Sequence, residues 1–152
     1  MRTVIAAGIL SLTWIAAAAA AEAVATTDGE TPGTRIDVKD LKRASDGTVM
    51  MRFTVFNDGD NALILNDLMK AEGTPDWHSV DGVYLLDSAG KKKYLVIRDA
   101  ERHCVCSRNL PDIPAKSSAN FWARFPAPPD SVEKISIVVP HFIPLDDVAL
   151  AK

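Results

Sequence analysis

Apolar residues recur at every second position in several stretches of this chain, and this spacing restricts the fold more than any other feature. In residues 48–56 every odd position is apolar, and these positions are Val49, Met51, Phe53 and Val55. Successive side chains of a β-strand point to opposite faces, so a period of two predicts strands buried on one side. The same alternation runs through three further stretches, residues 35–39, 120–125 and 134–139.

Shorter stretches that are apolar at consecutive positions predict central strands covered on both faces. These stretches are residues 62–65, 83–86 and 94–97. Turn-forming residues separate the strands at 45–47 and 57–61, and residues 87–91 are expected to close a hairpin. Seven or eight short strands at this spacing predict an all-β fold, an antiparallel β-sandwich. The exceptions are a helical turn within 67–73 and a long loop over 74–82.

The alternation also predicts which side chains form the core. Phe53 and Phe121 are expected to be buried on facing sheets. Arg52 and Arg124 occupy the opposite phase and are expected to lie outside the core.

The N-terminus has the parts of a secretory signal peptide, predicted to span residues 1–23. Arg2 supplies a positive start, residues 4–20 are apolar, and small residues then form overlapping A-x-A cleavage sites that end at Ala21, Ala23 or Ala25. A retained membrane anchor is the alternative, since the apolar run approaches the length that spans a bilayer. No cysteine lies near the cleavage point, so a lipid anchor is not expected. We therefore expect a secreted or periplasmic protein that is not membrane-spanning after cleavage, with a flexible lead-in over 24–34 and one domain over 35–150.

The charge balance argues against one class of partner. Without residues 1–23 the chain has 16 basic and 19 acidic residues, because the segment contains one of each. A nucleic-acid-binding domain would carry a basic stripe, and no such stripe is visible in the sequence. No nucleic-acid partner is expected.

Cys104 and Cys106 are the two cysteines of the chain and are separated by one residue. In a straight strand their Cα atoms would lie about 6.5–7 Å apart, too far for a disulfide, so bonding requires a bend at Val105. A ring this small would stabilise the fold by only about 1.6 kcal/mol before strain is subtracted. Three interpretations stay open: a local disulfide that fixes an edge loop, two buried thiols, or a metal or redox site.

His103 precedes the cysteine pair and is a possible accessory ligand. In a strand, however, it would point away from the face that carries the two sulfur atoms. A closed zinc site needs four donors, so His78 or His141 would have to arrive from distant loops. Cu(I) would accept two thiolates alone. We expect no metal site and no cofactor.

Two segments are candidate binding surfaces. Residues 76–81 read Asp-Trp-His-Ser-Val-Asp and contain every residue type of a hydrolase triad. A triad needs groups that converge from separate elements, so catalysis is not expected, but Trp77 and His78 are candidates for binding. Lys91, Lys92 and Lys93 form a basic hairpin tip, which would contact an anionic envelope polymer or lipid headgroups, or simply stay solvated.

Three pieces of the chain resemble a known group of domains. They read Tyr94-Leu-Val-Ile-Arg-Asp-Ala-Glu-Arg-His-Cys-Val-Cys-Ser107, Phe125-Pro-Ala-Pro-Pro129 and Ile135-Ser-Ile-Val-Val-Pro140. They are similar to an immunoglobulin-like, telokin-like extracellular domain of exported bacterial envelope proteins and lipoproteins. The resemblance implies a β-sandwich located outside the cytoplasm and assigns no catalytic residue.

The expected function is therefore that of an exported, non-catalytic module that binds an unknown protein or envelope component, or gives structural support, in the periplasm or cell envelope. The alternative is a periplasmic metal-handling or thiol-redox protein that uses Cys104 and Cys106.

Overall fold

The computed structural model describes residues 22–65, 69, 76 and 78–152. These residues form strands, turns and loops, and they contain no helix. The prediction of an all-β fold is confirmed for the described residues. The strands are β1 (Ala25–Asp28), β2 (Thr34–Arg43), β3 (Thr48–Asn57), β4 (Tyr84–Asp87), β5 (Lys92–Leu95), β6 (Ser117–Pro126), β7 (Lys134–Val138) and β8 (Leu145–Ala149).

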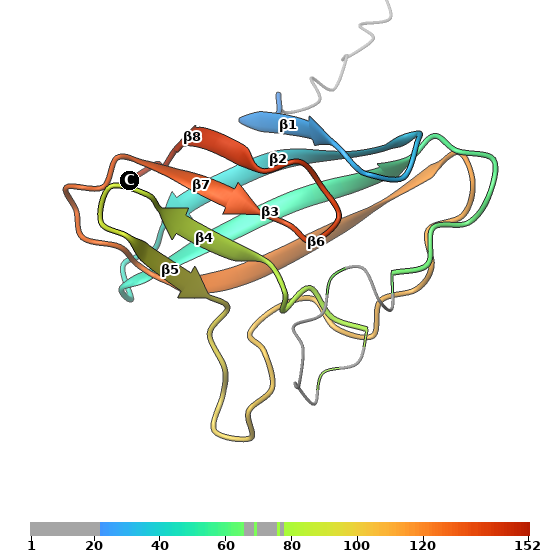
Figure 1. The fold of residues 1–152 in the computed structure, drawn as a ribbon. Coiled ribbons are helices and arrows are strands. Elements are labelled where there is room, and N and C mark those ends of the chain that lie inside the picture. Colours follow the sequence, from blue (N-terminus) through green and yellow to red (C-terminus); the bar gives the residue numbers. More distant parts are fainter. Residues whose placement is uncertain (1–21, 66–68, 70–75, 77) are drawn as a thin grey trace, which may run out of the picture.

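The strands form two antiparallel sheets that pack face to face (Figure 1). The first sheet has the order β1-β2-β3-β6, and the second has the order β5-β4-β7-β8. Four of the pairs are hairpins between consecutive strands, whereas β6 pairs with β3 and β7 pairs with β4 across long connections. The turns predicted at 45–47 and 87–91 are present, at 44–47 between β2 and β3 and at 88–91 between β4 and β5. The turn predicted at 57–61 was expected to join two strands, but among the described residues it follows β3 and leads into no strand.

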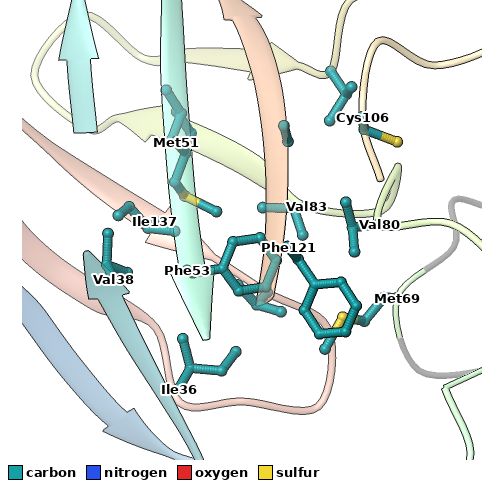
Figure 2. Packing of buried hydrophobic residues seen from close by; sticks show 14 of the residues in the cluster. Ile36, Val38, Met51, Phe53, Met69, Val80, Val83, Cys106, Phe121 and Ile137 are labelled. Carbon is teal, nitrogen blue, oxygen red and sulfur yellow. The ribbon is translucent and has the colours of Figure 1, made fainter. Parts of the chain in front are cut away.

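One apolar cluster fills the space between the sheets (Figure 2). The four alternating stretches became β2, β3, β6 and β7, and their apolar positions are buried as predicted. Phe53 and Phe121 are 1% and 4% exposed, whereas Arg52 lies on the surface. Their placement on facing sheets is wrong: they are direct cross-strand partners on β3 and β6, with ring centroids 5.6 Å apart. Two strands far apart in sequence are thereby joined at their centres.

Two strand predictions are also wrong. Residues 62–65 form no strand and make one isolated bridge, between Leu63 and Ile113. Residues 94–97 were expected to form a central strand. The strand found there is β5 (Lys92–Leu95), and it forms an edge of its sheet. Of its side chains, Tyr94 is buried and the other three are exposed.

The N-terminal part of the first sheet begins earlier than expected. The lead-in, 24–34, contains β1, which pairs with residues 35–38 of β2. The predicted signal peptide, except for its last residues, and most of the segment expected to hold a helical turn lie outside the described residues.

The sides of β2 and β6 that face away from β3 are covered by other segments. Along β2, β1 covers the first half, and Ala151 exchanges backbone hydrogen bonds with Leu41 and Arg43 along the second half. Along β6, the backbone of Val105–Ser107 bonds to Trp122 and Arg124. Unpaired edges promote association between chains, so these contacts make β2 and β6 less available for pairing with another chain.

In the part of the chain that the structure describes, no helix is long and apolar enough to cross a lipid bilayer.

Candidate functional site

The cysteine pair lies in an excursion of the chain between β5 and β6. Residues 97–99 run antiparallel to 103–105, with backbone bonds from Val105 to Ile97 and from Asp99 to His103. Arg102 closes the turn with a positive φ of 71°. This excursion projects beyond the sheets as the yellow hairpin in Figure 1. Its returning arm continues along β6, where the backbone of Val105–Ser107 bonds to the outer side of that strand.

Cys104 and Cys106 lie at disulfide-bonding distance, and their Cα atoms are 5.3 Å apart. This separation is shorter than that of i and i+2 in a straight strand, so the chain bends at Val105 as the sequence argument requires. Both residues are buried, with exposed fractions of 4% and 5%. The pair is therefore shielded from solvent at the point where the excursion joins the sheet edge.

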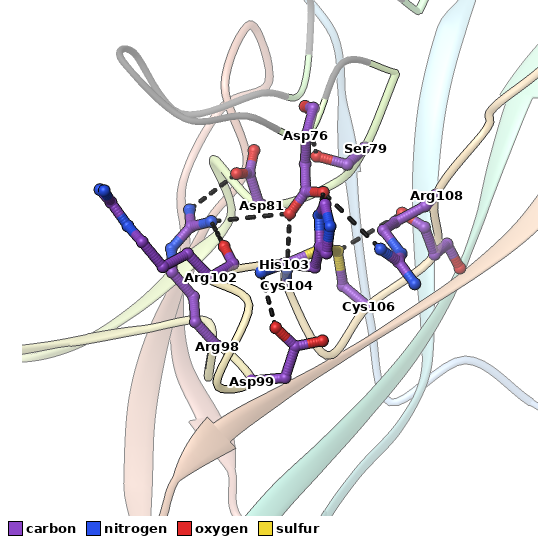
Figure 3. Close-up of polar contacts among 11 residues, drawn as sticks. Asp76, Ser79, Asp81, Arg98, Asp99, Arg102, His103, Cys104, Cys106 and Arg108 are labelled. Carbon is purple, nitrogen blue, oxygen red and sulfur yellow. Dashed lines mark hydrogen bonds and ion pairs between the residues drawn. A yellow bond between two sulfur atoms is a disulfide. The ribbon is translucent and has the colours of Figure 1, made fainter.

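Asp76 lies at the centre of the polar contacts that surround this pair (Figure 3). One carboxylate oxygen accepts a hydrogen bond from the backbone N–H of Cys104 at 2.5 Å. The other oxygen lies 2.7 Å from Nδ1 of His103. The side chain of Asp76 is only 3% exposed. A buried carboxylate needs such partners because its desolvation is costly.

Two arginines approach Asp76 from opposite sides, as Figure 3 shows. Nη1 of Arg98 lies 3.6 Å from one carboxylate oxygen, and Nη1 of Arg108 lies 3.8 Å from the other. The second guanidinium nitrogen of Arg98 forms a 2.8 Å ion pair with Asp81, whose side chain is fully buried. We call Asp76, Asp81, Arg98, His103 and Arg108 the Asp76 cluster. It fastens the loop that precedes β4 to the excursion that precedes β6.

The pKa of the Asp76 carboxyl is lowered from its ordinary value. Burial is the largest single influence and raises the pKa, because it disfavours the charged form. The hydrogen bonds from Cys104 and His103, with the charges of His103 and Arg108, together outweigh burial. Asp76 is thus held as a carboxylate at neutral pH.

The residue types of a hydrolase triad do not act together in the described structure. The Ser79 hydroxyl is fully buried and donates to the backbone carbonyl of Asp76 at 3.1 Å. The carboxylate of Asp76 contacts His103 and not the neighbouring His78. His78 has a positive φ of 59°, and its carbonyl accepts the N–H of Leu110. The segment serves as a structural turn in these contacts.

The remaining candidate residues are spread over the molecule. Lys93 places its ammonium 3.6 Å from the ring centroid of Tyr84, and Lys92 lies 5.0 Å from that of Tyr94, so two lysines of the basic tip cover aromatic rings. Lys91 occupies the turn with a φ of 51°. Trp77 lies outside the described residues. Among the residues that are described, no three His, Cys, Asp or Glu side chains are grouped as a metal site would require.

Sequence reasoning singled out His103 and residues 76–81 but did not bring them together. It missed Arg98 and the partnership of Asp76 with His103. Asp76 is more than 20 positions away from both Arg98 and His103, and the connection between them has no periodic pattern. The one available signal was an Asp in a loop beside apolar residues, which requires a buried partner from elsewhere.

The chain matches no family model, no curated protein and no solved structure.

Proposed function

We propose that this chain is an exported, non-catalytic immunoglobulin-like module that binds a partner, or gives support, in the periplasm or cell envelope. The observation that carries the proposal is that the Asp76 cluster joins two parts of the chain to each other. The described contacts of the Asp76 carboxylate run to residues 98–108, where they hold a loop to a sheet edge. A catalytic carboxylate is instead directed at an accessible substrate site.

The strand order supports the immunoglobulin-like part of the proposal. In such domains the sheets have the orders A-B-E-D and G-F-C, and C′ joins the edge beside C in variable-type domains. If β2 and β3 correspond to A and B, then β4, β5, β6, β7 and β8 follow as C, C′, E, F and G, and both sheet orders agree. Val105–Ser107 then takes the place of strand D beside β6. In this scheme the cysteine pair shapes an edge strand and takes no part in chemistry.

The position of β1 bears on the predicted processing. The N–H of Val24 already bonds to the carbonyl of Val38, and β1 begins at Ala25. Cleavage after Ala21 or Ala23 would leave this pairing intact, whereas cleavage after Ala25 would remove its first members. We therefore propose a mature N-terminus at Glu22 or Val24.

The test is expression of the full-length chain in a secreting bacterial host, followed by fractionation and mass analysis of the N-terminus. We expect protein outside the cytoplasm that begins at Glu22 or Val24. Thiol titration with and without denaturant should find no free thiol, and a metal assay should find no stoichiometric metal. An intact Met1 in the membrane fraction would overturn the export part. Two free thiols together with bound metal would favour the metal-handling alternative.

A further inference from the structure

The outer face of the first sheet is a second polar surface, distinct from the Asp76 cluster. Directly paired residues of adjacent strands share a face, so the side chains opposite to the core form rows across β2, β3 and β6. We call these rows, with Lys39 in the bulge of β2, the basic face. The rows are Arg35–Phe56–Ser118, Asp37–Thr54–Asn120, Asp40–Arg52–Trp122 and Lys42–Met50–Arg124.

Trp122 is the exposed aromatic ring of this face. It is 38% exposed, although an indole is among the side chains that gain most from burial. The ring of Phe56, by contrast, is covered by the guanidinium of Arg35, which lies 4.2 Å from its centroid. Trp122 is therefore the ring on this face that is open to a planar or apolar group.

A shallow hollow lies on each side of Trp122. One, of about 260 Å³, is bordered by Lys39, Thr54 and Asn120, and the other, of about 430 Å³, by Met50 and Arg124. Trp122 and Arg52 line both hollows. Two adjoining hollows that share an aromatic wall suit an extended ligand with successive units on either side of the ring.

Cations outnumber carboxylates on the basic face. The three strands contribute five cationic side chains to it and two carboxylates, in a chain whose net charge is −3. Arg52 pairs with Asp40 at 3.2 Å, and Arg124 pairs with Asp46 of the adjoining turn at 2.7 Å. Exposed pairs of this kind contribute little to stability, so either guanidinium is able to take a ligand carboxylate instead.

We infer that the basic face binds an acidic polysaccharide, a polymer of sugar rings that carry carboxylates. The C–H-bearing side of a sugar ring is apolar and fits the negative π-face of Trp122. Arg52 and Arg124 flank that ring and would pair with carboxylates of adjacent units, for which the planar guanidinium is well shaped. The amide of Asn120 would hydrogen-bond ring hydroxyls. This inference rests on the proposed function, because it names the ligand of the binding module.

The full-length chain is expressed, and the protein is purified in the form that the cell produces. The experiment then measures its migration through native gels that contain polygalacturonate. Gels with dextran, a neutral sugar polymer, and with polyglutamate, a polymer with carboxylates and no sugar rings, are run in parallel. We expect retardation by polygalacturonate well above that by either of the others. Trp122→Ala and the double variant Arg52→Gln with Arg124→Gln should each weaken binding about tenfold or more.

Matched variants separate the site from general surface effects. Leu95→Ala removes an apolar side chain that is 58% exposed on the other sheet, and Arg102→Gln with Lys134→Gln removes two exposed charges that lie outside the basic face. Both should bind as the unaltered protein does. Thermal unfolding of every variant checks the fold, and Trp122→Phe, which keeps a ring, should retain part of the affinity.

Equal retardation by polyglutamate would overturn the inference and favour an acidic protein partner. Unchanged binding by Trp122→Ala, or no binding at all, would also overturn it. If the protein is exported and has no free thiol, each of these results overturns the polysaccharide inference alone and does not contradict the proposed function. A chain that is retained inside the cell, or that carries free thiols and metal, would instead remove the proposed function whatever the gels show.

Discussion

The Asp76 cluster and the basic face use the same chemistry, arginines paired with aspartates, in opposite surroundings. In the cluster the Asp76 side chain is 3% exposed, and its contacts come from a single excursion of the chain. On the basic face Arg52 is 64% exposed and pairs with Asp40. Removing one partner from a buried pair leaves an uncompensated polar group, whereas exposed pairs exchange partners with water at little cost. Burial therefore assigns the cluster to structure and leaves the basic face available for binding.

Buried and exposed positions also differ between the inner and outer faces of β3 and β6. Phe53→Ala or Phe121→Ala should lower the free energy of unfolding by about 3–5 kcal/mol, because each leaves a cavity in the core. Arg52→Ala, one position away on the other face, should change it by less than about 0.5 kcal/mol. Urea denaturation at neutral pH measures all three. Similar small losses in all three would show that the inner and outer faces are not separated in this way.

Asp76→Ala should lower the free energy of unfolding by about 2–4 kcal/mol, since it leaves the buried N–H of Cys104 without its acceptor and removes the carboxylate between Arg98 and Arg108. Asp60→Ala is the control, because Asp60 pairs with Lys116 on the surface with its own side chain 88% exposed. No measurable change is expected for it in the same denaturation experiment. If Asp76→Ala is as well tolerated as the control, the cluster does not fasten the excursion.

Cys104→Ser with Cys106→Ser should lower the free energy of unfolding by no more than about 1–2 kcal/mol, because a ring this short removes little entropy from the unfolded chain. Thermal unfolding of the variant and of the oxidised protein gives the difference. Loss of the fold would contradict the secondary role given to the pair relative to Asp76. Loss of a bound metal with the fold intact would instead favour the metal-handling alternative.

The pH dependence of stability sharpens the contrast further. The pKa of Asp76 is lower in the folded protein than its ordinary value of 3.8, so the folded state favours the carboxylate. Its contribution is complete above about pH 4 and is lost as the pH falls through the lowered pKa. Asp76→Asn should therefore lie below the unaltered protein in stability at pH 7 and approach it as the medium becomes strongly acidic. A constant difference across that range would show that the charge of Asp76 contributes nothing.

The sequence predicted those parts of the fold that depend on local alternation. The inner faces of β3 and β6 follow from a period of two, and the hairpin turn at 44–47 follows from Asp46 and Gly47, whose φ of 77° suits glycine. Which strands become neighbours depends on long-range packing, so Phe53 and Phe121 were placed on facing sheets. Residues 62–65 are apolar enough for a strand, but their one described pairing is a single bridge.

The candidate site was predictable to a smaller extent. The requirement for a bend at Val105 follows from disulfide geometry, and the Cα separation of the pair agrees with it. The partners of Asp76 come from residues 98–108 and meet it only because the excursion folds back beside β6. Such convergence leaves no periodic trace in the chain.

The pairing of β3 with β6 has a consequence for how the protein folds. Asn57 pairs with Ser117, so the whole of residues 58–116 forms a loop that must close before the first sheet is complete. Closing long loops costs chain entropy before any contact repays it, so folds dominated by such pairings form slowly. Until that step, the β2–β3 hairpin exposes Val49, Met51 and Phe53 to solvent. We therefore expect the four local hairpins to form early, and the closure onto β6, together with its covering segment Val105–Ser107, to limit the rate of folding.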